Sequence, residues 1–273
     1  MPDGPERATP GAGGFRPCVV IPTYNNPATV RAVVERVRAY VPEVVVVDDG
    51  SAAPGREAVA ALGRDGLAHV THRERNGGKG AAVKTGFARA RELGFSHALQ
   101  VDADGQHSLE DMPKFLEVAR ARPEALVLGA PRYDESAPRG RLIARQITLF
   151  WTNFETHGRV IEDPMCGFRV YPLNVIGALE RALARTGDRM DFDIEVAVRL
   201  VWAGVEVVNL PTKVRYLSED EGGVSHFDML WDNLRIGWLH TRLSTRAVMV
   251  QPWIRLARAL SRRPPPWRAL SSS

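Results

Sequence analysis

The sequence predicts an α/β fold with a mostly parallel sheet flanked by helices. Short apolar runs alternate with amphipathic helical patterns through the first half of the chain, the order of a nucleotide-binding type of sheet. The runs at 18–21 and 44–47 are apolar throughout, which is typical of strands covered on both faces. Several of these runs end abruptly in polar residues, where open parallel sheets bind their ligands.

The elements follow one another without an internal repeat. The first half predicts strand 18–21, helix 28–41, strand 44–47, helix 54–63, strand 67–71, helix 80–93, strand 97–101, helix 109–121 and strand 125–129. Beyond residue 130 the alternation weakens. The pattern there predicts helix 139–157, a loop and strand over 163–171, helix 191–203, and strand 205–208 before Pro211.

A chain of 273 residues with 44% hydrophobic content can bury one good core. We expect one main domain over 15–226, followed by an amphipathic helical extension over 227–262. The Gly- and Pro-rich residues 1–14 and the tail at 263–273 predict disordered ends.

Cysteine content and hydropathy indicate the compartment in which the protein is expected. Cys18 and Cys166 form no disulfide framework and have no zinc-site spacing. No signal peptide is recognisable, and no apolar run reaches the length of a membrane span. We therefore expect a cytoplasmic protein.

The net charge of +4 is unevenly distributed, because the chain from Asn233 onward holds eight arginines and no acid. The spacing of Leu234 and Trp238 predicts a helix at 227–240, most simply one packed on the main domain. Residues 249–268, with Trp253 among arginines, predict peripheral contact with an anionic membrane at the inner face of the cell. No nucleic-acid recognition module accompanies the arginines, so nucleic acid is not an expected partner.

The most informative segment is Leu99–His107, where an apolar run ends in Asp102 and Asp104. Side chains at i and i+2 share one face of a strand, so the two carboxylates can bind one Mg²⁺ or Mn²⁺. The alternative interpretation is an exposed Asp-Gly turn.

Two further strand ends are polar, at Pro22–Asn26 and Asp48–Ser51. Asp49 can accept hydrogen bonds from a base or ribose, while Pro22 and Thr23 shape the pocket wall. The glycines of Asn76–Gly80 open a helix, where backbone N–H groups can approach phosphate oxygens. A tight turn explains these glycines equally well, since the spacing is not that of a P-loop.

Five motifs in this order give the chain a resemblance to the family 2 glycosyltransferases, in particular the polyprenyl (dolichyl) phosphate mannosyltransferase branch. They are Ile21–Asn25, Asp48–Ser51, Asn76–Gly80, Asp102–His107 and Cys166–Arg169. The resemblance covers about residues 17–226 and implies the GT-A fold.

The resemblance implies how the donor is bound. Asp102 and Asp104 would hold the metal on the donor diphosphate, and Gln106 would touch the same ion. The implied contacts of the nucleotide are Pro22, Thr23, Tyr24, Asn25, Asp49, Gly78, Lys79, Asp102 and Ala103.

The candidate residues for the acceptor side of the site are acids and arginines. Asp193, and after it Glu195, are candidates for the base that takes a proton from an acceptor hydroxyl. The alternative is that these acids merely favour a helix N-terminus. Arg132 is the best candidate to meet an acceptor phosphate, ahead of the three arginines of the following segment. A phosphate acceptor would need no base, because it is already ionised.

The chain departs from the branch at Gly223–His226, where relatives have Gly-x-Ser-Lys. A neutral His226 can be a metal ligand, although a lone histidine is more often structural. The departure also weakens the inference of a polyprenyl-phosphate acceptor.

The sequence thus predicts an inverting, metal-dependent glycosyltransferase. It would move a sugar from a nucleoside diphosphate to a lipid-linked or small-molecule acceptor, with Mg²⁺ or Mn²⁺ as cofactor. One alternative is a sugar-nucleotide pyrophosphorylase, which would have a Gly-rich basic loop where this chain has Pro22–Asn25. The other is a non-catalytic, membrane-associated nucleotide-binding module, which would tolerate loss of Asp102 and Asp104.

Overall fold

A seven-stranded sheet forms the centre of the computed structural model, which describes residues 14–132, 139–158, 160–214, 231–261 and 267–268. The strand order is β3-β2-β1-β4-β6-β5-β7, and β6 alone runs against its neighbours. The strands are β1 (Pro17–Thr23), β2 (Val44–Asp48), β3 (His69–His72), β4 (His97–Gln100), β5 (Leu126–Arg132), β6 (Arg169–Pro172) and β7 (Val207–Lys213). The predicted mostly parallel α/β sheet is confirmed.

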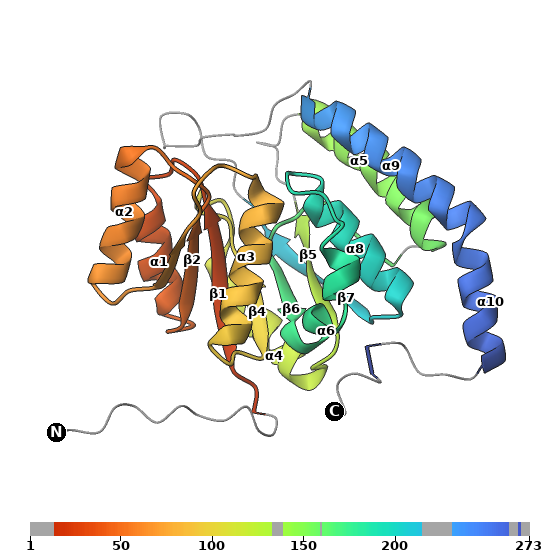
Figure 1. The fold of residues 1–273 in the computed structure, drawn as a ribbon, viewed down its shortest axis with the longest axis horizontal. Coiled ribbons are helices and arrows are strands. Elements are labelled where there is room, and N and C mark those ends of the chain that lie inside the picture. The colour runs from red at the N-terminus through yellow and green to blue at the C-terminus, as the bar shows by residue number, and fades with distance from the viewer. Residues whose placement is uncertain (1–13, 133–138, 159, 215–230, 262–266, 269–273) are drawn as a thin grey trace.

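Helices cover both faces of the sheet (Figure 1). They are α1 (Val30–Arg38), α2 (Ala53–Arg64), α3 (Lys79–Glu92), α4 (Met112–Ala121), α5 (Arg139–Thr156), α6 (Leu173–Ala178), α7 (Glu180–Leu183), α8 (Phe192–Ala203), α9 (Trp231–Met249) and α10 (Gln251–Ser261). A 3₁₀ turn at Leu109–Asp111 precedes α4, so the helix predicted at 109–121 is divided.

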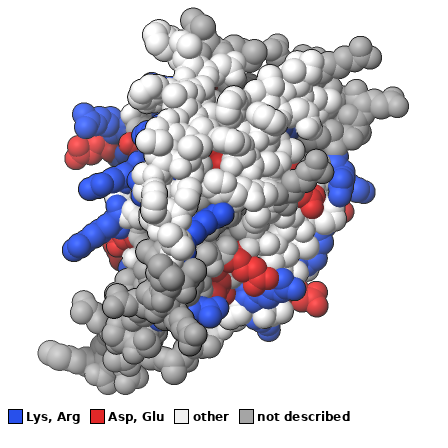
Figure 2. Space-filling view, turned by 90° about the vertical axis from the view of Figure 1, so that its right-hand side faces the viewer, with Lys and Arg blue, Asp and Glu red and all other residues white. Residues whose placement is uncertain are grey.

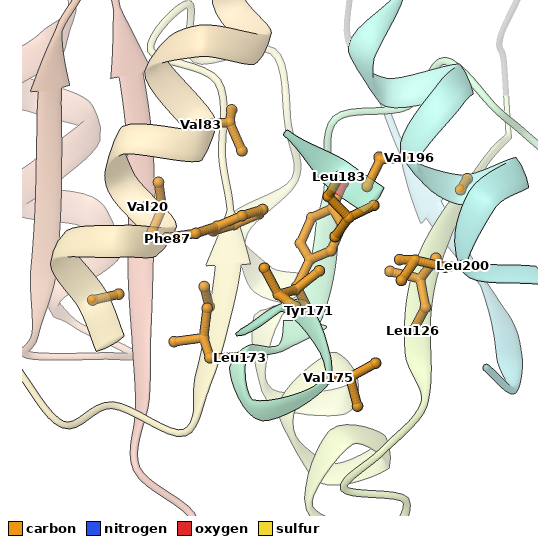
Figure 3. Packing of buried hydrophobic residues seen from close by; sticks show 14 of the residues in the cluster. Val20, Val83, Phe87, Leu126, Tyr171, Leu173, Val175, Leu183, Val196 and Leu200 are labelled. Carbon is orange, nitrogen blue, oxygen red and sulfur yellow. The ribbon is translucent and has the colours of Figure 1, made fainter. Parts of the chain in front are cut away.

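Alternation along each strand divides the core into two layers. Val20 packs with α3, α6 and α8 on one face, whereas Val19 packs with α1, α2 and α4 on the other. In the first layer Phe87 of α3 meets Tyr171 of β6 with ring centroids 4.8 Å apart (Figure 3). The continuous apolar strands are therefore buried on both sides, as their sequence predicts.

Strand β7 differs from its prediction, which ended the strand at 208 before Pro211. It continues through Pro211 to Lys213 and pairs with β5 over its whole length. Proline lacks the N–H of a ladder bond, and a strand at the sheet edge tolerates this loss on its unpaired side.

The C-terminal helices lie against the second half of the sheet. Ile236, Leu239 and Leu243 of α9 pack on Ile194 and Val198 of α8. In Figure 1, α9 runs beside α5, and α10 continues from its end. The predicted packing of 227–240 on the main domain is thus confirmed for its described part. None of the helices in the described part of the chain has the length and hydropathy that crossing a membrane requires.

Candidate active site

The polar strand ends predicted from the sequence meet at one edge of the sheet. Strand β1 lies between β2 and β4, and Thr23 at its end is in register with Asp48. Asp102 follows β4 at the same edge, because β4 is parallel to β1. This is the position where open α/β sheets place their ligands.

Lys79, the first residue of α3, joins two of the candidate carboxylates. Its Nζ lies 2.9 Å from Asp102 Oδ1 and 2.9 Å from Asp193 Oδ2. Burial acts to lower the pKa of Lys79, but the charges of Asp102 and Asp193 outweigh it and raise that pKa. Likewise burial acts to raise the pKa of Asp102, and the charge of Lys79 outweighs it and lowers that pKa. The ammonium group is therefore a fixed positive charge at the centre of the site.

Gly167 allows this close approach. A Cβ at this position would lie 2.6 Å from Asp102 Oδ2 and 2.8 Å from Lys79 Nζ. A larger residue at this position of the Cys166–Arg169 motif would thus displace the Asp102 carboxylate or the Lys79 ammonium group, a role that the sequence analysis did not assign.

Arg169 is a second residue whose role the sequence analysis missed. Its guanidinium is fully buried and donates to the carbonyl oxygens of Cys166 at 2.6 Å, Pro164 at 2.7 Å and Asp193 at 2.5 Å. It therefore fixes the start of α8 against the loop before β6. An arginine that begins an apolar strand was the available signal, since such a charge is buried only with several acceptors.

Asp104 opens into a pocket of about 440 Å³ that Gln106, His107 and Thr29 also line. Burial and then the charge of Asp102 raise the pKa of Asp104. His107 Nε2 lies 3.3 Å from Asp102 Oδ2, while His107 Nδ1 is buried without a hydrogen-bond partner among the described residues. Two carboxylates that repel each other beside a pocket suit a divalent cation.

The protein supplies only part of the ligand set that Mg²⁺ or Mn²⁺ needs. Within the described ranges no three His, Cys, Asp or Glu side chains are arranged to hold a metal ion. Magnesium is commonly held by one or two carboxylates with water and substrate phosphate, so Asp102 and Asp104 suffice if a diphosphate completes the set. The predicted third ligand, His226, lies outside the described residues.

Asp49 faces the glycine loop. Its Oδ1 accepts from Gly77 N at 3.1 Å, and its Oδ2 accepts from Gly78 N at 2.6 Å. Arg73 Nε lies 3.3 Å from Oδ1, and burial raises the pKa of the carboxyl group. The two N–H groups that could meet a phosphate are thus held by Asp49, and its contact with a nucleoside stays a prediction.

Glycine is needed at position 78 for two reasons. Its φ is +100°, and a Cβ there would lie 2.5 Å from the carbonyl oxygen of Asp188. Ala81 N donates to the same oxygen at 3.0 Å. The start of α3 is therefore built against the loop that precedes α8.

The first motif is bonded to the second, and Thr29, which follows the first motif, is bonded to the fourth. Asn25, with φ of +53°, donates through its N–H to Ser51 Oγ at 2.8 Å and accepts from Ala52 N at 2.8 Å. Thr29 Oγ1 donates to the carbonyl oxygen of Ala103 at 2.8 Å. Pro22 and Thr23 are buried at the end of β1, and Tyr24 follows them. These bonds hold the predicted nucleotide-binding residues in one group.

Asp193 and Glu195 point to different places. Asp193 reaches Lys79, and its Oδ1 also accepts from Gln100 Nε2 at 3.2 Å. Glu195 is fully buried. Its Oε1 accepts from Arg199 Nε at 2.8 Å, and its Oε2 accepts from Gly187 N at 2.9 Å and Arg242 Nη2 at 2.8 Å. The structure thus brings Asp193 to the aspartate pair and uses Glu195 to join α8 to α9.

The arginines predicted to meet an acceptor phosphate also lie in different surroundings. Arg132 ends β5 with an exposed side chain at the same sheet edge as Asp102. Arg145 pairs instead with Asp163, with Nη2 2.8 Å from Oδ1. The side chains of Arg139 and Arg141 lie outside the described part of the chain. Arg132 thus lies at the sheet edge that bears Asp102, and its contact with an acceptor phosphate stays a prediction.

Neither cysteine is a candidate nucleophile. Cys18 and Cys166 are free and buried, and burial raises the pKa of each thiol to about 12. A thiol is nucleophilic only as its thiolate, so both are structural.

Known proteins are similar to this chain in sequence and in fold. The model of "Glycosyl transferase family 2" matches residues 18–174. Polyprenol monophosphomannose synthase of Mycolicibacterium smegmatis is 32% identical over 220 residues, 77% of this chain and 80% of that protein. Undecaprenyl-phosphate mannosyltransferase of Micrococcus luteus is 29% identical over 209 residues, 72% of this chain and 82% of that protein.

Among solved structures, glucosyl-3-phosphoglycerate synthase from Mycobacterium tuberculosis, in complex with Mn²⁺, UDP and glucosyl-3-phosphoglycerate, superposes with a TM-score of 0.56. The match covers 87% of this chain and 80% of that chain at 17% identity, so it shows a shared fold. The predicted GT-A fold and the resemblance to polyprenyl-phosphate mannosyltransferases are confirmed. The chain belongs to glycosyl transferase family 2 and is a glycosyltransferase.

Proposed function

We propose that the protein transfers a sugar, with inversion and with the aid of Mg²⁺ or Mn²⁺, from a nucleoside diphosphate to a polyprenyl phosphate at the cytoplasmic face of a membrane. The observation that carries the proposal is the convergence of Asp102, Asp193 and Lys79 beside Asp104 at the ligand-binding edge of the sheet. The relatives named for polyprenol and undecaprenyl-phosphate acceptors support the acceptor class.

The donor side needs positive charge where the diphosphate leaves. A divalent cation bound to Asp102 and Asp104 would stabilise the developing negative charge of the leaving nucleotide. Lys79 holds a permanent positive charge against the same Asp102, at 2.9 Å. Its ammonium group would orient Asp102 and lie near the diphosphate.

The acceptor side depends on the chemistry of the nucleophile. A phosphate is already ionised near neutral pH, so its attack needs no general base, and Asp193 then serves to hold Lys79 in place. Arg132 would bind the acceptor phosphate, because a guanidinium donates two parallel hydrogen bonds to such a group. Were the acceptor an alcohol, Asp193 would be the base, since Glu195 has both oxygens engaged away from the site.

Thermal unfolding tests the donor part of the proposal. UDP-, GDP- and dTDP-sugars are added separately, each with and without Mn²⁺. We expect one nucleotide class to raise Tm only with the metal present, because a ligand that binds the folded state stabilises it. If no nucleotide gives a metal-dependent shift, the proposal is wrong.

Product analysis tests the acceptor part. With the donor so identified and radiolabelled in its sugar, undecaprenyl phosphate should carry the label into an organic phase, and undecaprenol should not. Equal transfer to the alcohol would refute the phosphate acceptor while leaving the donor assignment intact.

A further inference from the structure

The large exposed hydrophobic side chains of the described residues gather on one side of the molecule. Tyr40 apart, all of them lie on or between α5, α9 and α10. Trp238 is 68% exposed, Trp253 70% and Phe150 65%. We call this surface the α5–α9–α10 face and define it by its exposed residues Ile147, Phe150, Phe154, Leu234, Trp238 and Trp253.

Helical spacing makes these side chains continuous. On α5, Ile147, Phe150 and Phe154 follow one another at intervals of three and four, so they share one stripe. On α9, Leu234 and Trp238 form the stripe opposite to the one that packs on α8. Figure 2 shows this side of the molecule as a broad area with few charged side chains, and charged groups lie around its border.

The face also has a shallow apolar depression along α5. A hollow of about 420 Å³ on α5 is lined by Leu142, Ile143, Gln146, Ile147 and Phe150. Soluble monomers rarely expose contiguous apolar patches of more than a few hundred Å², and larger ones mark sites of interaction. The face is therefore a candidate interaction surface.

Charge decides between the possible partners. The only acids of the three helices, Glu155 and Asp232, are buried, whereas Arg235, Arg246 and Arg255 are exposed. In a symmetric dimer the face would meet the same surface of a second copy, and the described parts of the three helices offer no exposed carboxylate there to pair with the arginines. An anionic lipid surface supplies the opposite charge, and exposed tryptophans favour the boundary between headgroups and acyl chains.

We propose that the α5–α9–α10 face docks on an anionic lipid bilayer, with its aromatic side chains in the boundary region and its arginines against the headgroups. This proposal deepens the proposed function and rests on it, because docking serves catalysis only if the acceptor is a lipid. Arg132 ends β5 at the edge of the sheet that bears Asp102, and α5 begins at Arg139. A bilayer under α5 would thus lie beside the acceptor side of the site. The docking surface would include α5 and the first half of α9 as well as α10.

Flotation with vesicles tests the docking surface, in the absence of donor and acceptor. Wild type should float with vesicles of phosphatidylcholine mixed with phosphatidylglycerol, and far less with phosphatidylcholine alone. Phe150→Glu and Trp238→Glu should each lower the partition coefficient by about tenfold or more, because each puts a charge in the apolar layer. The matched control is Tyr40→Glu, which changes an exposed aromatic residue away from the face and should bind as wild type does.

Folding and catalysis are controlled separately. All three positions are exposed, so Tm should stay that of wild type, and a short-chain polyprenyl phosphate that dissolves in water should be used equally by all variants. That result distinguishes failure of docking from failure of the proposed function. Vesicle binding that is unchanged in both face variants would overturn the proposal. So would a stable dimer in sedimentation equilibrium that the face variants dissociate, since the occupant would then be a second copy.

Discussion

Lys79 Nζ lies 2.9 Å from both Asp193 Oδ2 and Asp102 Oδ1, so one ammonium group joins the aspartate pair after β4 to the start of α8. The first half of the chain carries the predicted donor motifs, and the second half carries the predicted acceptor groups. This pair of ionic contacts is therefore a direct physical link between the two halves of the site, beside the hydrogen bond from Gln100 to Asp193, and it motivates the first two predictions.

Asp102→Asn and Asp104→Asn should each lower kcat/KM by about a hundredfold or more, because each removes a carboxylate charge that would hold the divalent cation on the donor diphosphate. The metal-dependent rise in Tm with the donor nucleotide should disappear as well. Asp65→Asn, which changes an exposed aspartate at the end of α2, is the matched control and should retain both. A variant of the pair that keeps the metal-dependent shift would contradict the assignment.

Asp193→Asn and Glu195→Gln should fail in different ways. Asp193→Asn removes the second partner of Lys79 and should lower kcat with little change in Tm. Glu195→Gln leaves Arg199 and Arg242 without their carboxylate and should cost about 3 kcal/mol of unfolding free energy. Its kcat per folded molecule should stay near that of wild type. Urea unfolding and single-turnover rates measure the two effects, and a stable but inactive Glu195→Gln would restore Glu195 as the candidate base.

Gly167→Ala should disable the site without a charge change. The new methyl group would lie 2.6 Å from Asp102 Oδ2, so Asp102 and Lys79 must move. We expect the KM for the donor to rise about tenfold or more, since displacement of a binding group by 1 Å is costly. Gly140→Ala in α5 meets nothing within 4 Å and should leave the KM unchanged. Equal kinetics in the two variants would show that the contact does not matter.

Asp48 should make stability depend on acid pH. It is buried and accepts from Ser51 N at 2.9 Å, and His72 Nδ1 lies 2.9 Å from its Oδ2. Burial acts to raise its pKa, but these hydrogen bonds outweigh burial and lower the pKa from 3.8. The charged form is thus favoured by folding, and its stabilisation is present above about pH 3.8 and is lost as the pH falls through the lowered pKa.

Asp48→Asn should therefore destabilise the protein by about 2 kcal/mol at pH 7, and by less at pH values below the usual aspartate range. Urea unfolding of both proteins across this range gives the difference. A penalty that is constant with pH would show that the carboxylate charge is not what stabilises the turn after β2.

Much of the fold could be predicted because its signals are local. The apolar runs of β1 and β2 and the helical spacing of Val30, Val33 and Val37 determine element type within a few residues. Strand β6 could not be placed in this way. Its insertion between β4 and β5, in the opposite direction, depends on partners distant in sequence.

The same distinction between local signals and contacts distant in sequence applies to the site. The sequence by itself predicted the apolar strand before Asp102, and it predicted that Asp193 lies on a different side of its helix from Glu195, because both follow from local periodicity. Strand β4 ends at Gln100, so Asp102 and Asp104 lie in the segment after it and do not share a strand face as predicted. Only the tertiary structure decided which side faces the site. Asp193 meets Lys79 of α3, Glu195 meets Arg242 of α9, and Asp49 turns to Gly78. Periodicity gives relative directions within one element, whereas the packing of elements from distant parts of the chain decides what each direction meets.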